Sequence, residues 1–301
     1  MSHFIKQNSC QCSFATSESW VVLSSIEQSI KQKIEKAGTP LKDWDINIYR
    51  GVLTGFNDAF IISSQKREEI LNNCKTEEER KKTDELIRPI LRGRDIKRYG
   101  YDWAGLYLVY IPWHFPLHKD NTIQGASEKA EKEFQKQYPA VYGHLLNYKK
   151  ELSARNKAET GIRYEWYALQ RWGANYSDDF FKQRIIYREI GEEMDACLIP
   201  KGIVINNKLY MVSGENLEFL IIFFNSSLFN KIILQTANLT GGKGVDFMDK
   251  INVIKPTNQD ILKAKELLAS SDDESKDDFI NSLYRLSEEE INFIKSSITT
   301  K

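Results

Sequence analysis

Apolar residues recur along this chain of 301 residues with two periods, one typical of amphipathic helices and one typical of strands. The helical period is clearest near the N-terminus, where isoleucines recur at intervals of four residues from Ile26 to Ile34. Ser24 or Ser25 is suited to cap the first turn, because a serine hydroxyl can accept a backbone N–H. Gly38 is suited to end the segment in the left-handed conformation. The pattern therefore predicts a helix between these caps.

β-branched and aromatic residues fill the segment "DINIYRGVLTGFNDAFII" (45–62), which predicts two extended runs joined by a turn from Thr54 to Asn57. Gly51 and Gly55 interrupt these runs. Because glycine has no Cβ, it permits a positive φ or a close approach to another surface, whereas Thr54 and Asn57 carry hydrogen-bonding side chains. A hairpin or a β-bulge is the simplest explanation of the glycines, and contact with a ligand is the alternative.

The remaining patterns predict an α+β fold with a mixed sheet, flanking helices and a helical C-terminal extension. The predicted elements are, in chain order, exposed helices of mixed charge at 66–87, a strand at 106–113, a helical stretch at 127–155 that breaks near Pro139, strands at 182–190 and 202–213, a buried helix at 215–234, a loop at 240–244 and three helices after Pro256. We place a flexible lead-in at 1–18, the main domain at 19–257 and the extension at 258–301.

Composition indicates a globular protein, since 41% of the residues are hydrophobic, 12% are aromatic and the formal net charge is zero. The four cysteines have neither the pattern of a disulfide framework nor the spacing of a structural zinc site. No signal-peptide pattern is visible at the N-terminus, and the longest apolar stretch, 217–224, is much shorter than the roughly twenty residues that span a bilayer. We therefore expect a soluble, cytoplasmic protein that does not contact a membrane.

The zero net charge conceals an uneven distribution of charges. In "IRPILRGRDIKRYGY" (87–101), five cations face a single carboxylate, whereas the C-terminal helices are acidic. Arginines also alternate with aromatic residues in "GIRYEWYALQRW" (161–172) and again in 182–190. Arginine forks reach phosphates and guanine edges, and aromatic rings support them by packing or stacking. A cation–π cluster inside a structural core is the alternative for 161–172.

Motifs that mark common enzyme classes are incomplete in this sequence. The glycines that flank Lys243 are typical of a phosphate loop, but no serine or threonine follows the lysine, which leaves a backbone nest for one phosphate as the alternative. His114 and His118 are four residues apart, but Pro116 between them argues against a helical metal site, so we expect no bound metal. The sequence contains neither a Gly-x-Ser-x-Gly elbow nor the Asn-Pro-Pro-aromatic or Asp-Pro-Pro-aromatic motif of amino-methyltransferases.

Several segments, in their order along the chain, resemble one family. "WDINIYRGVLTGFNDAFII" is similar to the opening signature of the TaqI-like specificity domain, the C-terminal target recognition domain of adenine-specific DNA methyltransferases and type IIG restriction-modification enzymes. The segments that follow in the family's order are "IRPILRGRDIKRYGY", "YPAVYGHLLNYKKELSAR" with its terminal arginine, "RYEWYALQRW", "KQRIIYREI", "NNKLYMVSGENLEFLIIFFNSSLFN", "LTGGKGVDFMDKINVIKP" and "INSLYRLSEEEINFI". The resemblance covers residues 18 to 298.

This resemblance implies a domain that clasps duplex DNA opposite a methyltransferase domain or subunit, reads the site and selects the adenine that is flipped into the partner's pocket. It implies no catalysis and no cofactor in this chain alone. The parent enzyme would use S-adenosylmethionine, with Mg²⁺ where a nuclease is present. Our candidates for phosphate contacts are Arg88, Arg92, Arg94, Lys97, Arg98 and Lys243, and our candidates for base reading are Thr54, Asn57, Arg163, Trp166, Gln170 and Arg171. The glycines of 51–57 would then allow this turn to approach DNA.

Other interpretations stay open at this point. The chain is either a segment of a larger enzyme or a stand-alone specificity subunit of a restriction-modification complex. A metal-dependent nuclease that uses Asp178, Asp179 or Glu189 is a rival from another class, and magnesium-dependent cutting by the purified chain would favour it. A protein-interaction subunit with charged docking helices is a second rival, which binding to a partner without DNA affinity would favour.

Overall fold

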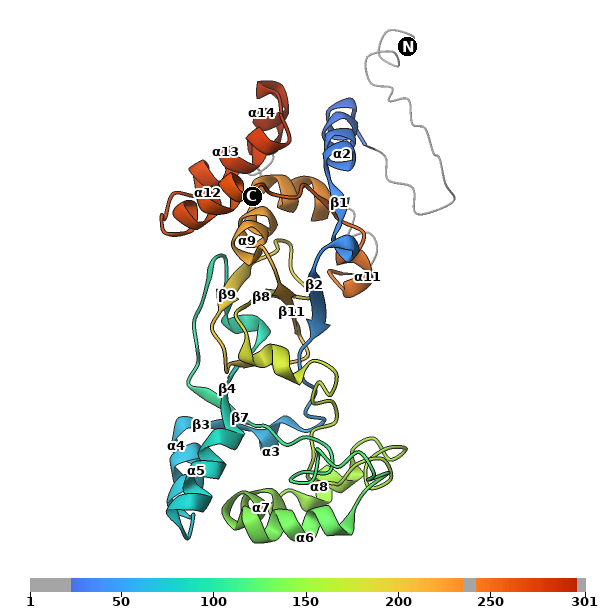
Figure 1. Ribbon diagram of the computed structural model, residues 1–301, viewed down its shortest axis with the longest axis vertical. Helices are drawn as coiled ribbons and strands as arrows, with labels where there is room; N and C mark the ends of the chain where they lie inside the picture. Colours follow the sequence, from blue (N-terminus) through green and yellow to red (C-terminus); the bar gives the residue numbers. More distant parts are fainter. Residues whose placement is uncertain (1–22, 235–241, 297–301) are drawn as a thin grey trace, which may run out of the picture. The chain divides into compact units, whose positions relative to one another are not determined.

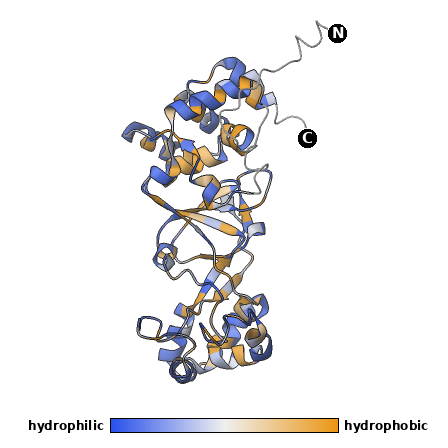
Figure 2. Ribbon diagram, turned by 90° about the vertical axis from the view of Figure 1, so that its right-hand side faces the viewer, coloured by the Kyte–Doolittle hydropathy of each residue, from blue (hydrophilic) through white to orange (hydrophobic). Residues whose placement is uncertain are grey.

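The computed structural model describes residues 23–234 and 242–296, so the predicted lead-in at 1–18 lies outside the described residues. The chain divides into two units. Unit 1 comprises Met1–Ile48, Tyr187–Leu198 and Gly214–Lys301, and unit 2 comprises Tyr49–Ile186 and Ile199–Ser213. Both helices and strands are present, which confirms the predicted α+β class. Figure 2 shows that the helices combine hydrophilic and hydrophobic residues, as amphipathic patterns require.

Unit 2 is built on a mixed sheet with the strand order β10-β4-β7-β3. Its strands are β3 (Ile61–Ser63), β4 (Ile87–Leu91), β7 (Leu106–Val109) and β10 (Val204–Ile205). Strand β7 pairs antiparallel with β3 and β4, in a register that places Leu108 opposite both Ile61 and Arg88, and β10 runs parallel to β4. Helices α4 (Ser64–Asn72) and α5 (Glu77–Leu86) contact each other and the sheet (Figure 1).

The predicted helical stretch with a break near Pro139 is confirmed in unit 2. Helix α6 (Glu128–Gln137) ends before Pro139, which occupies the first turn of α7 (Pro139–Leu146), and the short helix α8 (Lys149–Ala154) follows. Proline suits this position because the first helical N–H groups have no partner within the helix. Helix α7 contacts both α6 and α4, so these helices share one side of unit 2 (Figure 1).

The segment 45–62 does not form the hairpin that its pattern predicts. Strand β2 (Ile46–Arg50) and strand β3 belong to different sheets, and between them Asn57 begins a short helix, α3 (Asn57–Phe60). The backbone after β2 pairs with distant segments instead, since Gly51 N–H donates to the Leu209 carbonyl and Val52 N–H to the Ile205 carbonyl. The hairpin prediction is therefore wrong because long-range partners replace the local one.

Unit 1 contains the N-terminal helix α2 (Ser25–Ala37) and the apolar helix α9 (Leu217–Asn225). Ser24 caps α2 and forms a reciprocal capping box with Glu27, as a capping serine predicts. Gly38 ends α2 with a φ of −92°, so the predicted left-handed end is wrong. A Cβ on Gly38 would lie 2.8 Å from the backbone carbon of Asn252, which shows that close packing explains the glycine.

The helices after Pro256 are confirmed in unit 1 as α12 (Asn258–Leu268), α13 (Asp273–Leu283) and α14 (Glu288–Ser296). Helix α9 contacts α12 and α13, and α14 contacts α2 (Figure 1). The predicted buried helix at 215–234 is divided, because α9 ends at an extended Ser226 and a π-helical turn, Phe229–Ile233, follows. Helix α11 (Val245–Met248) and a small antiparallel pair, β1 (Thr39–Pro40) with β12 (Asn252–Val253), complete the unit.

The other four-stranded sheet has the order β2-β11-β8-β9. Its strand β8 (Arg184–Arg188) confirms the predicted strand at 182–190, and β11 (Leu209–Gly214) confirms the one at 202–213. Strand β9 (Ala196–Ile199) was not predicted. The predicted limit between the main domain, 19–257, and the extension, 258–301, stays a prediction. Within residues 23–234 and 242–296, every helix is too short or too polar to cross a bilayer.

Candidate nucleic-acid interface

Two segments of unit 2 that the sequence analysis singled out separately lie side by side. Leu53 and Arg171 exchange both of their backbone hydrogen bonds, each with an N···O distance of 2.9 Å. This antiparallel bridge joins the turn that follows β2 to the arginine–aromatic segment 161–172. The structure therefore brings Asn57, Gln170 and Arg171 to one part of unit 2.

A buried arginine after helix α8 fastens the same two segments. Arg155 Nη1 donates to the Thr54 carbonyl, and Nη2 donates to the carbonyls of Trp166 and Ala168 at 2.7 Å and 2.8 Å. Arg155 Nε donates to the Leu152 carbonyl at 3.0 Å. Burial lowers the pKa of the Arg155 guanidinium to about 10, so the group is charged at neutral pH. Sequence reasoning noted this residue only as the terminal arginine of a helix, because its partners are backbone oxygens that no sequence pattern marks.

The two glycines of this turn serve close packing within unit 2. Gly55 has a φ of +76°, and a Cβ on it would lie 2.6 Å from Gln170 Oε1 and 2.8 Å from Arg155 Cδ. Gly51 is buried, and a Cβ there would lie 2.6 Å from the backbone carbon of Asn206. The expectation that Gly51 allows the chain to approach DNA is therefore wrong, since the surface it approaches is the protein's own backbone.

The candidate base-reading residues fall into an exposed and a buried group. Asn57, Arg163 and Arg171 are exposed and Gln170 is half-buried, whereas Thr54 and Trp166 are buried. The Thr54 hydroxyl donates to Asn57 Oδ1 at 2.7 Å, so it orients an exposed amide. In this structure Thr54 supports Asn57, whereas the Trp166 side chain packs against other parts of unit 2. Base contact by any of the six stays a prediction.

Trp166 and Arg163 have partners that fit the packing alternative. Trp166 Nε1 donates to Glu131 Oε1 at 2.7 Å, and the Lys149 ammonium lies 4.9 Å from the tryptophan ring centroid. Arg163 lies over the Trp113 ring at 5.4 Å and pairs with Glu159 at 2.9 Å, yet its side chain is 59% exposed. The cation–π contacts are thus real, but they connect 161–172 to other segments and leave the Arg163 guanidinium accessible.

The basic segment 87–101 is divided in the same way. Arg88 is half-buried between the rings of Tyr110 and Phe181, at 5.4 Å and 4.5 Å, and burial lowers the pKa of its guanidinium. Arg92 forms a two-pronged pair with the buried Asp95, at 3.1 Å and 2.9 Å. These two arginines therefore hold the segment in place through contacts within the protein.

The other three cations of this segment are exposed. Arg94 lies in a 3-10 turn, Gly93–Asp95, and Lys97 lies in β5 (Ile96–Lys97), which pairs antiparallel with β6 (Gly100–Tyr101). Arg98 follows in the two-residue loop of this hairpin. Lys97 faces the exposed Asp102 at 3.6 Å, and such solvent-exposed pairs are weak. Three cations are thus presented on one short hairpin and the turn before it.

Lys243 lies in unit 1 and is buried. Its ammonium donates to the carbonyls of Gly191 and Glu193, both at 2.8 Å. Burial and, to a smaller extent, the charge of Arg188 lower the pKa of the Lys243 ammonium to about 8. A phosphate would compete with two existing hydrogen bonds, so the phosphate role of Lys243 stays a prediction. Of the predicted loop at 240–244, residues 240 and 241 lie outside the described residues.

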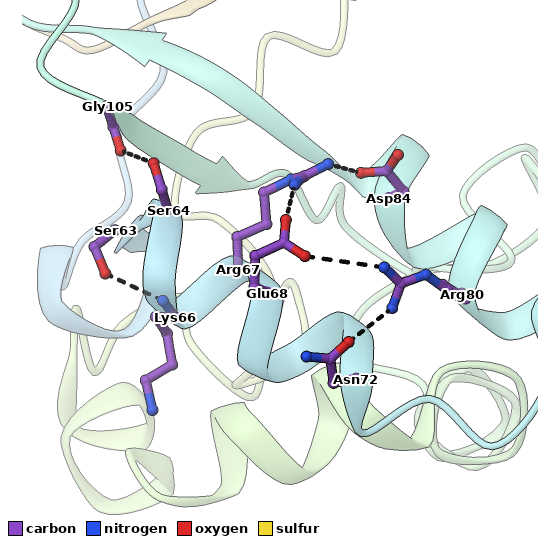
Figure 3. Close-up of polar contacts among 9 residues, drawn as sticks. All are labelled: Ser63, Ser64, Lys66, Arg67, Glu68, Asn72, Arg80, Asp84 and Gly105. Carbon is purple, nitrogen blue, oxygen red and sulfur yellow. Dashed lines mark hydrogen bonds and ion pairs between the residues drawn. The ribbon is translucent and has the colours of Figure 1, made fainter.

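The mixed charges of α4 and α5 pair with one another. Figure 3 shows Arg67 between Glu68 and Asp84, and Arg80 between Glu68 and Asn72. These contacts satisfy both signs of charge within the face, as expected of a solvated surface.

Two carboxylates of the nuclease alternative, Asp178 and Asp179, have solvent exposure or structural partners. Asp179 accepts from Lys182 Nζ at 2.6 Å and from the Ser213 hydroxyl at 2.9 Å, while Asp178 is exposed. In the part of the chain that the structure describes, no group of three or more histidine, cysteine, aspartate or glutamate side chains is arranged to hold a metal ion.

Comparison with known proteins gives one family match. The family model for the TaqI-like C-terminal specificity domain matches residues 88–244, a range that includes 161–172 but not 45–62. No curated protein matches the sequence.

Solved structures give weaker likenesses. The type IIL restriction-modification enzyme MmeI, in complex with DNA, is 11% identical with a TM-score of 0.48, over 85% of this chain and 35% of that chain. The type IIG restriction endonuclease BpuSI is 12% identical with a TM-score of 0.45, over 87% of this chain and 33% of that chain. The chain thus spans about a third of the length of each enzyme.

Proposed function

The chain belongs to the family of TaqI-like C-terminal specificity domains, as its sequence predicts, and from this premise we propose that it recognises a specific base sequence in duplex DNA. The observation that carries the proposal is the bridge between Leu53 and Arg171. It places the exposed side chains of Asn57 and Arg171 on adjoining segments of unit 2. A pair of adjoining segments with exposed amide and guanidinium groups suits the reading of base edges.

Each exposed side chain in this proposal has a chemical role. The oxygen of the Asn57 amide accepts from Thr54, so its N–H groups are available to donate to an acceptor on a base. Arg171 is suited to donate two hydrogen bonds to a guanine edge. Gln170, whose side chain lies beside Gly55, is suited to help position Arg171. Arg163 is accessible for a base or a phosphate. Thr54 acts through Asn57, and Trp166 acts as a packing residue whose carbonyl accepts from Arg155.

We assign the holding of the DNA backbone to the exposed cations Arg94, Lys97 and Arg98. A cation that neutralises a phosphate releases condensed counterions, which strengthens binding to every sequence alike. Arg88 and Arg92 contribute by fixing the segment through aromatic rings and Asp95. The same division between holding and reading is found in most DNA-binding proteins, because phosphate contacts carry no sequence information.

We further propose that the chain is the specificity part of a restriction-modification adenine methyltransferase, as a segment of the enzyme or as a separate subunit. The partner would bind S-adenosylmethionine, with Mg²⁺ where a nuclease is present, and would act on the adenine that this chain selects. The chain alone would then have no catalytic activity.

Selection of duplexes from a random library by the purified chain tests the proposal. We expect one motif to be enriched and to bind more tightly than a scrambled duplex at the same salt concentration. Equal affinity for all duplexes, or affinity for a protein partner without affinity for DNA, would refute sequence recognition. Magnesium-dependent cutting by the purified chain would instead support the nuclease alternative.

A further inference from the structure

We propose that Arg155 is a positioning residue that fixes the geometry of the reading surface formed by Asn57, Gln170 and Arg171, an inference that rests on the proposed function. Arg155 is buried, and its guanidinium contacts both segments that carry these side chains. It does not reach the exposed surface itself. Its effect on DNA binding is therefore exerted through the backbone of its neighbours.

The partners of Arg155 are backbone carbonyls from separate parts of unit 2. Leu152 belongs to helix α8, Thr54 to the turn after β2, and Trp166 and Ala168 to the arginine–aromatic segment. Among the described residues, no carboxylate forms an ion pair with Arg155. One planar group thus sets the distance between three pieces of backbone.

The arrangement depends on the shape of the guanidinium as well as on its charge. A buried charge without a counter-charge carries a desolvation penalty that carbonyl oxygens only partly offset. An apolar side chain of similar size would avoid this penalty but would leave the Thr54, Trp166 and Ala168 carbonyls without this donor. A lysine would keep the charge but lacks the planar fork that reaches several carbonyls at fixed angles. The guanidinium geometry is therefore the property that the site uses.

The turn itself is packed against this guanidinium. Since a Cβ on Gly55 would lie 2.6 Å from Gln170 Oε1 and 2.8 Å from Arg155 Cδ, the turn has no space to shift toward either side chain. Asn57 follows two residues later, and Gln170 and Arg171 lie within three residues of Ala168. Base reading tolerates errors of about half an ångström in side-chain placement, so this close packing bears on discrimination.

The phosphate contacts of the proposal lie on a different segment. Arg94, Lys97 and Arg98 belong to the turn and hairpin between residues 93 and 101, to which Arg155 makes no hydrogen bond in the described residues. A change at Arg155 should therefore reduce the preference for the selected sequence and leave sequence-independent binding intact.

Arg184 provides a matched control in the same unit. It is fully buried, donates to the carbonyls of Phe180, Lys182 and Ile203, and has a guanidinium pKa that burial lowers to about 10. These are the burial, partner type and pKa of Arg155, but none of the partners belongs to the reading segments. Arg184→Lys should therefore reproduce the loss of stability of Arg155→Lys without its effect on reading.

The experiment compares wild type, Arg155→Lys and Arg184→Lys in melting temperature and in affinity for the selected and a scrambled duplex at one salt concentration. We expect both variants to melt earlier and only Arg155→Lys to lose about tenfold of the preference for the selected duplex. An unchanged preference in Arg155→Lys, or an equal loss in both variants, would overturn the inference. A wild-type chain without any preference would instead refute the proposed function.

A second pair of variants keeps the test decisive if Arg155→Lys does not fold. Gly55→Ala presses on Arg155 and Gln170 from the exposed side of the turn, whereas Gly202 has a φ of +90° with no atom within 4 Å of the position of its Cβ. We expect Gly55→Ala to lose the preference and Gly202→Ala, which has the same kind of backbone strain, to keep it. Equal behaviour of these two variants would contradict the inference.

Discussion

Replacing the three exposed cations of the basic segment should weaken binding to every duplex by the same factor. The change is the combination of Arg94→Ala, Lys97→Ala and Arg98→Ala, which keeps the backbone pairing of the hairpin and the pair of Arg92 with Asp95. The exposed Arg98 guanidinium lies over the Tyr99 ring at 5.4 Å, a contact that contributes little at an exposed site. Lys97 has one exposed acidic neighbour, Asp102, and such exposed pairs contribute little to stability. We therefore expect a nearly unchanged melting temperature.

The magnitude follows from counterion release. Each phosphate contact contributes about 0.9 to the slope of log affinity against log salt, so three contacts contribute about 2.7. Raising the salt concentration from about 50 to about 200 mM should therefore weaken binding by wild type about fortyfold more than it weakens binding by the variant. Titration of one labelled duplex at four salt concentrations, repeated with a scrambled duplex, measures both slopes.

Arg92→Ala is the control for this measurement. It removes two hydrogen bonds to the buried Asp95 and should cost about 1–3 kcal/mol of the free energy of unfolding, without changing the salt slope. A salt slope that stays the same in the triple variant, or a loss of affinity for only one of the two duplexes, would refute the assignment of these cations to phosphates.

Four further predictions concern reading, stability and cofactor binding. Arg171→Ala should cost about 1–3 kcal/mol of binding to the selected duplex and much less on scrambled DNA, with a nearly unchanged melting temperature; equal losses on both would place Arg171 on phosphate. Thr54→Val should cost about 1 kcal/mol of binding to the selected duplex, because it removes the hydroxyl that orients Asn57. The double variant Thr54→Val with Asn57→Ala should lose no more binding than Asn57→Ala alone. Because the pKa of Lys243 is about 8 in the folded chain and near 10.4 when unfolded, the unfolded state binds more protons between these values. The free energy of unfolding of wild type should therefore rise by about 3 kcal/mol from about pH 7 to about pH 11 relative to Lys243→Met. Denaturant titrations that run parallel for these two proteins would contradict this. Calorimetry should detect no binding of S-adenosylmethionine to the chain, and a micromolar isotherm would mean that it contains a methyl-donor site.

Local signals in the sequence predict the helices of this protein well. The serine before α2, the break at Pro139 and the polar faces after Pro256 each act within a few residues, so the sequence alone places these elements. The hairpin prediction for 45–62 is wrong because the partners of this segment, such as Leu209 and Arg171, are more than a hundred residues away in the sequence. The predicted left-handed conformation of Gly38 is wrong for a similar reason, since this glycine makes room for the backbone of the distant strand β12.

The candidate site was also predicted only in part from the sequence. The types of residue suited to DNA contact are visible in the sequence, but whether a side chain is exposed depends on distant packing. Lys243 and Trp166 are chemically suitable and are nevertheless buried, with partners such as Gly191 and Glu131 that no spacing indicates. Arg155 shows the converse, because its importance arises from main-chain oxygens that every residue possesses.

Because Arg155 binds main-chain oxygens, the backbone of the site is held independently of the side chains that it presents. Arg155 recognises the main chain of Thr54, Trp166 and Ala168 and is indifferent to the side chains there. The exposed positions of Asn57 and Arg171 are therefore free to vary without loosening the attachment of the backbone that carries them. On the proposed function, a substitution at either position would change the groups offered to a base while the hydrogen bonds between Arg155 and the main chain stay in place.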